Sequence, residues 1–139
     1  MRTVITSGCF DCLHEGHISF LEKSKALGDW LIVLLNTDEY CRRVKGEGRP
    51  FQDFNSRRDA LMNLECVDDV LRLDKENACM WLAKEYPRRA YMNTWRFTKG
   101  IEYAQQNIVE RLMCDNLGIA LVFIDSGSPL HSSYFNLLQ

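Results

Sequence analysis

The 139-residue sequence predicts an α/β fold, in which a parallel sheet of five strands carries helices on both faces. Apolar stretches typical of buried strands alternate along the chain with segments whose apolar residues recur at helical spacing. The stretch at residues 30–36 is apolar almost throughout, as expected for a strand that helices cover on both sides. Because no repeat, low-complexity segment or linker divides the sequence, we expect one domain over residues 1–139.

The expected elements follow one another in alternating order. We expect strands at residues 3–6, 30–36, 67–73, 90–92 and 119–124. We expect helices at about 16–27, 55–65, 76–86 and 101–117, and a short one from residue 132 onward. Gly118 is a typical stop signal for the longest of these helices. In such a sheet the crossovers are right-handed, and ligands bind beyond the carboxyl ends of the strands.

Composition narrows the classes of function. Apolar residues make up 46% of the chain, which is ample for one core. The formal net charge of −2 gives no general electrostatic case for binding nucleic acid. No apolar stretch approaches the roughly 20 residues of a membrane span, and residues 1–3 lead straight into a strand without a signal peptide. We therefore expect a soluble cytoplasmic protein with no nucleic-acid or membrane partner.

Six cysteines raise the question of disulfides, zinc or redox chemistry: Cys9, Cys12, Cys41, Cys66, Cys79 and Cys114. Only Cys9 and Cys12 have a suggestive spacing. A structural zinc site commonly takes four ligands from two such clusters, and the sequence has no second one. We expect reduced cysteines that fill space, with a redox or zinc protein built on Cys9 and Cys12 as the alternative.

Residues 7–17, Ser-Gly-Cys-Phe-Asp-Cys-Leu-His-Glu-Gly-His, lie where the first strand turns into the first helix. His14 and His17 are three residues apart and share a helix face, so both rings can converge on one ligand. The first backbone N–H groups of the helix favour an anion. Gly16 removes a side chain where a phosphate oxygen would approach. The segment predicts a site that handles phosphate.

The pattern Gly-x-Phe-Asp-x-x-His-x-Gly-His resembles the signature of the cytidylyltransferase-like nucleotidyltransferases. Further landmarks occur in the family's order: Leu27-Gly28-Asp29, the strand from Trp30, Asn36-Thr37-Asp38-Glu39, Arg43 to Pro50, Arg57 and Val67-Asp68. The resemblance covers residues 2–74 well and the rest loosely. It implies a Rossmann-like three-layer α/β/α sandwich with a parallel five-stranded sheet. It also implies Mg²⁺-dependent transfer of CMP or AMP from CTP or ATP to a small phosphorylated alcohol or sugar, with release of pyrophosphate.

The resemblance also implies roles for single residues. His14 and His17 would hold the triphosphate and stabilise the transition state, and Lys45 would close over the phosphates from a mobile loop. The alternatives are two histidines that only cap the helix and an ordinary solvated lysine. The remaining predicted nucleotide contacts in this half of the chain are Gly8, Cys9, Phe10, Asp11, Gly16 and Arg57, with Arg58 as the neighbouring alternative to Arg57. Asp38 and Arg49 would lie near the acceptor, and Asp11 would also order the turn or help to orient the site. The alternatives are a helix-capping role for either aspartate and a solvent-facing loop position for Arg49.

Two segments depart from the family's pattern. After the fourth strand the family shows Lys-Gly-Gly-Asp-Tyr/Trp or Met-Gly-Asp-Asp-Trp, whereas the residues after 90 read Tyr-Met-Asn-Thr-Trp-Arg. Met92 and Trp95 would then seat the base, unless Trp95 is a surface or interface aromatic. Near the end, the family's Arg-Thr-x-Gly-x-Ser-Thr-Thr is replaced by residues 125–133. There Gly127, Ser132 and Ser133 would bind phosphate at a helix start, or form a plain turn and cap.

Three classes of function remain open at this point. The first is a nucleotidyltransferase similar to glycerol-3-phosphate cytidylyltransferase, which the Met92 to Trp95 segment slightly favours. Adenylyltransferases similar to the ADP-heptose or FAD-synthetase enzymes are the alternative within this class, and the Lys45 loop fits the ADP-heptose type. The second class is a degenerate family member that senses nucleotides, and the third is the redox or zinc protein. The resemblance also suggests a homodimer.

Overall fold

A parallel sheet forms the centre of the computed structural model, which describes residues 1–73, 78, 81, 84–85, 94–105 and 108–127. Its five strands lie in the order β3-β2-β1-β4-β5. The strands are β1 (Arg2–Gly8), β2 (Trp30–Asn36), β3 (Asp69–Leu73), β4 (Thr94–Gly100) and β5 (Ala120–Ile124). The helices are α1 (Glu15–Lys25), α2 (Asp38–Lys45), α3 (Phe54–Met62) and α5 (Val109–Leu117), and η2 (Ile101–Tyr103) is a short 3₁₀ helix. The strand order reverses between β1 and β4, which places a switch point there.

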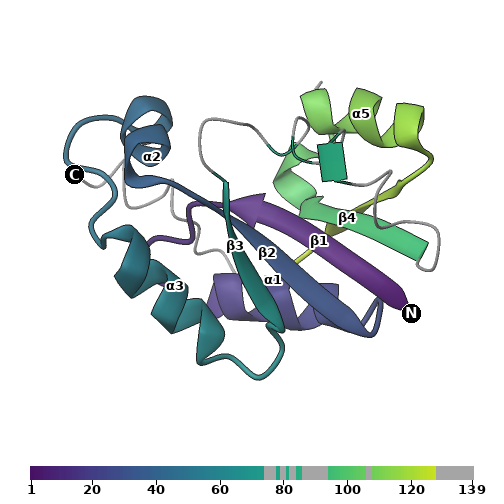
Figure 1. Cartoon of the computed structure of the whole chain (residues 1–139), viewed down its shortest axis with the longest axis horizontal. Coiled ribbons are helices and arrows are strands. Elements are labelled where there is room, and N and C mark those ends of the chain that lie inside the picture. Colours follow the sequence, from purple (N-terminus) through teal and green to yellow (C-terminus); the bar gives the residue numbers. More distant parts are fainter. Residues whose placement is uncertain (74–77, 79–80, 82–83, 86–93, 106–107, 128–139) are drawn as a thin grey trace.

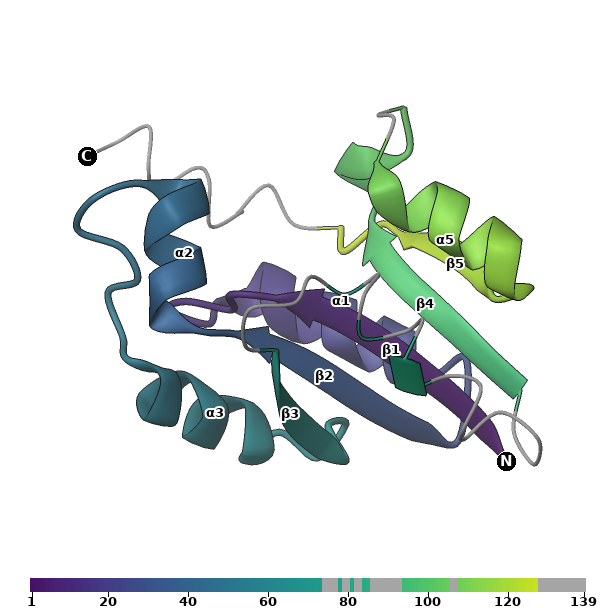
Figure 2. The ribbon, with the colours of Figure 1, turned by 45° about the horizontal axis from the view of Figure 1, so that its top comes forward.

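Helices cover both faces of the sheet (Figure 1), with α1 and α3 on one face and α5 on the other. Successive side chains of a strand point to opposite faces. The odd-numbered residues of 31–35 in β2 therefore pack with Leu21 of α1 and Leu61 of α3, while the residues between them pack in the cluster that contains Cys114 of α5. Figure 2 shows the same layers from another side. The predicted three-layer sandwich with a parallel five-stranded sheet is confirmed.

Most of the predicted elements are present. The strands expected at 3–6, 30–36, 67–73 and 119–124 correspond to β1, β2, β3 and β5, and the helices expected at 16–27 and 55–65 correspond to α1 and α3. Within the predicted helix 76–86, the described residues 78, 81, 84 and 85 are helical. The strand predicted at 90–92 and the helix predicted from residue 132 lie outside the described residues. The fourth strand of the described sheet is β4, at Thr94–Gly100.

The prediction of one long helix over 101–117 is wrong in its first half. The chain leaves β4 at Gly100, passes through η2 and begins α5 only at Val109. The apolar spacing that continues back from α5 to Ile101 imitates a longer helix, because short-range periodicity does not show where a helix starts. Gly118, with φ of 72°, ends α5 as predicted.

Trp95 is the second residue of β4 and belongs to the core. Its side chain is 6% exposed and stacks on Trp81 with ring centroids 6.2 Å apart. The predicted contact between Trp95 and a nucleobase is therefore wrong. The alternation of buried Trp95 and Phe97 around Arg96 is a strand pattern, but the charges of Arg96 and Lys99 concealed it in the sequence.

Replacing Trp95 by phenylalanine should reduce stability and leave ligand binding unchanged. The smaller ring leaves part of the core unfilled, which we expect to lower the free energy of unfolding by about 1–2 kcal/mol. Thermal unfolding and the dissociation constant of a nucleoside triphosphate would be measured on the same preparation. A folded variant that bound the nucleotide more than tenfold more weakly would instead support a stacking role for Trp95.

The sequence analysis did not predict helix α2. Thr37 is its N-cap, and the Thr37 hydroxyl oxygen accepts a hydrogen bond from the backbone N–H of Tyr40 at 3.2 Å. Acidic residues in the first turn and basic residues in the last turn suit the helix dipole. The helix is short and mostly polar, and Cys41 is its buried residue. Its apolar residues, Tyr40, Cys41 and Val44, span little more than one turn, too short a stretch for helical spacing to be recognised.

Cys9 and Cys41 form a disulfide, with their Cα atoms 6.1 Å apart. The expectation of reduced cysteines is wrong for this pair, and Cys9 is not paired with Cys12, which is free and exposed. Cys9 follows β1, and Cys41 lies in the helix after β2, the strand next to β1. The fold brings the two together across 32 residues of sequence, a separation that no local spacing reveals.

The described part of the chain contains neither a membrane-spanning helix nor a cluster of metal ligands. None of its helices has both the length and the apolar character needed to cross a membrane. None of its histidine, cysteine, aspartate and glutamate side chains come together in a group of three that could hold a metal ion.

Candidate active site

A pocket of about 330 Å³ lies at the carboxyl edge of the sheet. Four strands contribute their last residue to its lining, namely Gly8, Asn36, Gly100 and Ile124. The pocket therefore lies beside the switch point between β1 and β4, where open parallel sheets bind ligands. Several predicted site residues line it: Gly8, Cys9, Phe10, His14, Gly16, His17 and Lys45.

His14 and His17 form a reciprocal cap at the start of α1. His14 Nδ1 accepts hydrogen bonds from the backbone N–H groups of Gly16 at 3.0 Å and His17 at 3.4 Å. His17 Nδ1 accepts one from the N–H of His14 at 3.3 Å, and the two rings stack with centroids 3.9 Å apart. Since each Nδ1 is an acceptor, a neutral ring carries its proton on Nε2. In this tautomer Nε2–H is the second polar group of each ring, and both histidines line the pocket.

The two sequence interpretations of these histidines are therefore compatible, because one ring nitrogen caps the helix and the other is a donor. The first backbone N–H groups of the helix were expected to favour an anion, but those of Gly16 and His17 donate to His14 Nδ1. These two groups therefore belong to the helix cap.

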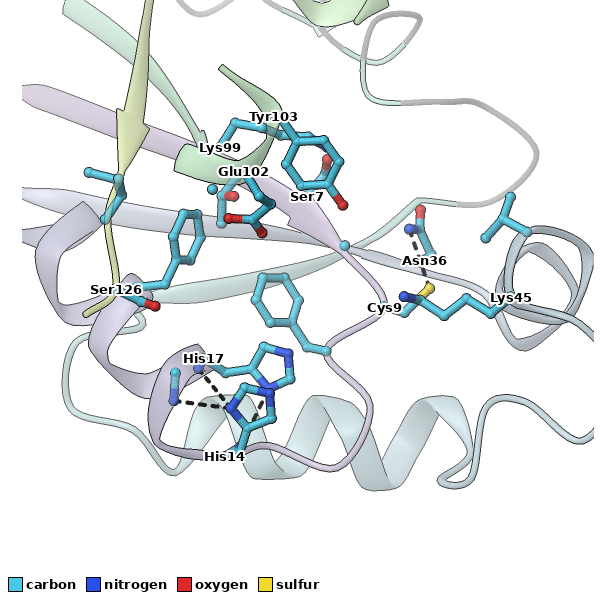
Figure 3. Close-up of a pocket in the computed structure, with 18 of the residues that line it drawn as sticks. Ser7, Cys9, His14, His17, Asn36, Lys45, Lys99, Glu102, Tyr103 and Ser126 are labelled. Atoms are coloured by element: carbon cyan, nitrogen blue, oxygen red, sulfur yellow. Dashed lines mark hydrogen bonds between the residues drawn. The ribbon is translucent and has the colours of Figure 1, made fainter. Parts of the chain in front are cut away.

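Lys45 was predicted to lie in a mobile loop, but it is the last residue of α2. Figure 3 shows Lys45 entering the pocket from a different side than the histidines. The glycines that follow have positive φ, 103° at Gly46 and 85° at Gly48, a conformation that other residues rarely adopt. Burial lowers the pKa of Lys45, and the charges of Arg49 and Lys99 lower it further. An anion in the pocket would relieve this repulsion.

The lowered pKa of Lys45 predicts a pH dependence of ligand binding. Its ammonium group loses its charge at a lower pH than an exposed lysine does, so affinity for a triphosphate should decline as the solution becomes alkaline. Titrations of nucleotide between about pH 7 and pH 10 would measure this decline. In the Lys45→Arg variant the charge persists over that range, so its affinity should change less. If affinity declined equally with pH in the wild type and in Lys45→Arg, the charge of Lys45 would not be the cause of the decline.

A second group of charged and aromatic side chains in the pocket was not predicted. Lys99 is the residue before the last one of β4, and its Nζ lies 3.6 Å from Glu110 Oε1 and 4.7 Å from the centroid of the Tyr103 ring. Burial raises the pKa of Tyr103, and the carboxylates of Glu102 and Glu110 raise it further. Lys99 thus brings a second lysine into the lining, and Glu102 a carboxylate (Figure 3).

A sequence signal for this group exists. Residues 99–103 read Lys-Gly-Ile-Glu-Tyr, which is similar to the family's Lys-Gly-Gly-Asp-Tyr with isoleucine in place of the second glycine and glutamate in place of aspartate. This segment was not recognised because the fourth strand was predicted at 90–92, and the family's motif was expected directly after that strand. Asn36, Tyr40, Val44 and Ser126 also line the pocket and were not predicted.

Asp11 and Arg49 hold the pocket's loops together from outside its lining. The buried Asp11 carboxylate accepts hydrogen bonds from the backbone N–H groups of Phe51 at 2.7 Å and Gln52 at 3.0 Å, and from Arg49 Nε at 3.1 Å. Arg49 is 6% exposed. The expectation that Asp11 orders the turn is confirmed, whereas the predicted contacts of Asp11 with nucleotide and of Arg49 with acceptor are not supported. The two residues fasten the loop after Lys45 to the loop before α1.

Arg57 is fully buried and donates to four groups of the protein. Its guanidinium donates to the carbonyl oxygens of Cys9 at 2.8 Å, Asn36 at 3.0 Å and Gln52 at 3.0 Å, and to Asp38 Oδ1 at 2.6 Å. The predicted phosphate contact of Arg57 is therefore wrong, and Asp38 is its partner and not a residue of the pocket lining.

The neighbouring alternative, Arg58, is exposed and lies 3.4 Å from Asp59. Near the end of the described chain, the backbone oxygens of Asp125 and Ser126 accept hydrogen bonds from Lys23 Nζ and Ser19 Oγ, at 2.6 Å and 2.7 Å. Gly127 is exposed and lies outside the pocket lining. The predicted contacts at Met92, Ser132 and Ser133 lie outside the described residues.

Residues 5–132 match the family described as cytidylyltransferase-like. The chain belongs to the cytidylyltransferase-like family. Bifunctional protein HldE of Azorhizobium caulinodans is 38% identical over 125 residues, which span 90% of this chain and 25% of the relative. Bifunctional protein HldE of Pelobacter propionicus is 35% identical over 130 residues, 91% of this chain and 25% of the relative. The chain thus spans about a quarter of the length of these relatives.

Solved structures agree with this membership. The lipopolysaccharide core biosynthesis protein from Thermoplasma volcanium is 29% identical, with a TM-score of 0.67 over 90% of this chain and 95% of that one. A putative nicotinate-nucleotide adenylyltransferase from Vibrio parahaemolyticus has a TM-score of 0.64 over 99% of this chain and 86% of that one, at 14% identity. The second likeness shows the fold alone. The predicted membership in a family of nucleotidyltransferases is confirmed.

Proposed function

We propose that this protein is a nucleotidyltransferase that moves AMP from ATP to a phosphorylated sugar and releases pyrophosphate. The observation that carries the proposal is the convergence of His14, His17 and Lys45 on one pocket at the carboxyl edge of the sheet. Lys99 adds a further cation to the same lining. Such a set of donors and cations suits a triphosphate and not a neutral ligand.

The reaction needs charge stabilisation more than covalent chemistry. An oxygen of the acceptor phosphate attacks the α-phosphorus, the bond to the bridging oxygen breaks, and pyrophosphate leaves with that electron pair. Negative charge grows on oxygens that are already anionic. The Nε2–H groups of His14 and His17 would donate to these oxygens, and the ammonium group of Lys45 would neutralise charge on the phosphates. Since the helix cap fixes both rings beforehand, little reorganisation is needed during the reaction.

Two arguments favour ATP over CTP as the donor. The sequence argument for a glycerol-phosphate cytidylyltransferase used Met92 and Trp95, but Trp95 lies in the core. The motif at residues 99–103 instead resembles the Lys-Gly-Gly-Asp-Tyr form, and the HldE relatives support the ADP-heptose type of enzyme. A CTP-dependent enzyme remains the second candidate within the family.

Mg²⁺ is part of the proposal as a companion of the triphosphate. Mg²⁺ usually binds through one or two carboxylates together with substrate phosphates, and it keeps several waters. Among the residues that line the pocket, Glu102 supplies a carboxylate. This donor set fits an ion that the nucleotide brings with it, and Mg²⁺ would neutralise charge on the phosphates. A homodimer in the cytoplasm, as the family resemblance suggests, is also proposed.

The test is an assay of pyrophosphate release with each of the four common triphosphates, Mg²⁺ and a panel of sugar and polyol phosphates. We expect turnover with ATP and a sugar phosphate, at least tenfold faster than with CTP. Preference for CTP with a polyol phosphate would move the protein to the second candidate. Nucleotide binding without pyrophosphate across the whole panel would contradict an enzyme and support the sensor.

The sensor is less well supported than it was from the sequence. The main reason to consider a sensor was the loss of the family motif after the fourth strand. The Lys-Gly-Ile-Glu-Tyr segment at 99–103 supplies a version of that motif. A protein that only senses nucleotides has less need of two capped histidines and a desolvated lysine in one pocket.

A further inference from the structure

A disulfide joins the two segments that bring the pocket's histidines and its α2 lysine together. Cys9 precedes the histidines and lines the pocket (Figure 3). Its partner Cys41 lies in α2, one helical turn before Lys45. We propose that the Cys9–Cys41 pair is a redox modification site, whose disulfide fixes Lys45 in the pocket and thereby raises the affinity for nucleotide. The proposal rests on the proposed function, because it takes the pocket to be the triphosphate site.

The loop that carries Cys9 is held in place without the disulfide. Arg57 Nη1 donates to the carbonyl oxygen of Cys9 at 2.8 Å. The carboxylate of Asp11, two residues later, accepts from the backbone N–H groups of Phe51 and Gln52. Breaking the disulfide would leave these contacts intact. The loop and the histidines that follow it should therefore keep their positions in the reduced protein.

Helix α2 depends more strongly on the disulfide. It has eight residues, a length at which an isolated helix is unstable in water. Its start is fixed by the Thr37 cap and by the pair of Asp38 with Arg57. Its end runs into Gly46 and Gly48, where a side-chain carbon would meet open space, and the next anchored residue is Arg49, paired with Asp11. Cys41 is the buried residue of the helix, so reduction would loosen the half that carries Lys45.

The redox step is an exchange between thiols and disulfides. A thiolate of a small dithiol attacks Cys9 Sγ, the Cys9–Cys41 bond breaks, and Cys41 leaves as a thiolate that takes up a proton. The second thiol of the reductant then releases Cys9 and closes the reductant's own disulfide, so two electrons move in total. Oxidation is the reverse exchange with a small disulfide. Attack occurs at Cys9 because it is 6% exposed and faces the pocket, whereas Cys41 is fully buried.

The location of Cys9 adds a consequence that a disulfide remote from the site would not share. A nucleotide in the pocket would cover Cys9, so ATP should slow reduction of the bond. The rate of reduction by dithiothreitol, followed by alkylation and mass spectrometry, would be compared with and without ATP. Equal rates at saturating ATP would contradict the proposal.

The main experiment measures ATP affinity by calorimetry, without acceptor, in protein treated with dithiothreitol or with oxidised glutathione. We expect the reduced protein to bind at least about fivefold more weakly, at the lower end of typical coupling between two sites. Cys41→Ser and Cys41→Ala should bind with the weaker affinity in both treatments. Cys12→Ser, which changes a free cysteine of the same loop, should retain the full response.

Counting the free thiols distinguishes a failure of the redox proposal from a failure of the proposed function. Equal affinity in both states, with mass spectrometry showing that the disulfide was present and then broken, would overturn the redox site and leave the proposed function untouched. Free thiols at Cys9 and Cys41 after oxidation would overturn it as well. Failure to bind any of the four triphosphates in either state would overturn both proposals.

Discussion

The His17→Ala variant should lose nearly all turnover and keep its fold. The imidazole of His17 presents an N–H donor in the pocket, and removing one such donor from the oxygens of a transition state typically lowers the rate by about 10²–10³-fold. Its Nδ1 also accepts from the backbone N–H of His14 at 3.3 Å, so a small loss of stability accompanies the substitution. Pyrophosphate release and thermal unfolding, measured on the same sample, give both effects.

His17→Gln is the matched control for that substitution. Glutamine three residues after an N-cap can reach back to the N–H of the cap residue, so it preserves the capping contact without the imidazole. We expect its stability to lie near that of the wild type and its rate to stay low. Recovery of near-normal turnover in His17→Gln would show that His17 acts through the helix cap alone.

Replacing Arg57 by alanine should give the largest loss of stability. The guanidinium binds three carbonyl oxygens and Asp38, and it is fully buried. Removal of one partner of such a group costs about 3–5 kcal/mol, because the remaining polar groups lose their donors. That is a large part of the roughly 5–15 kcal/mol that stabilises an ordinary domain. Denaturant unfolding would measure it.

Arg58→Ala tests whether the effect of Arg57→Ala depends on position. Arg58 is the next residue, carries the same charge and has an exposed side chain paired with exposed Asp59. We expect a change within about 0.5 kcal/mol. If both variants lost the same stability, the network around Arg57 would not be the cause.

The helices and strands that were predicted correctly are those whose residue pattern lies within one segment of the sequence. β2 is apolar up to its last residue, Asn36, because helices cover it on both faces, and α1 and α3 show helical spacing. These elements were therefore predicted within a few residues. α2 was missed because it is polar and contains the single buried residue Cys41. β4 was missed because Arg96 and Lys99 interrupt its apolar pattern.

For the candidate site, too, the residues predicted correctly are those that belong to a local motif. His14, His17 and Lys45 were predicted from local motifs, and the structure brings them to one pocket. Arg57 and Asp11 were given ligand contacts, but both satisfy backbone groups that are distant in sequence. A motif shows that a residue type is required and does not show whether it faces the ligand or the protein. The disulfide of Cys9 with Cys41 likewise depends on the pairing of β1 with β2.

The structure of the protein with Mg²⁺ and a non-hydrolysable ATP analogue is the most direct measurement of the central claim. The account predicts the triphosphate in the pocket at the carboxyl edge of the sheet, with its oxygens on the Nε2 atoms of His14 and His17 and near Nζ of Lys45. A triphosphate bound at any other surface, with this pocket unchanged, would contradict it.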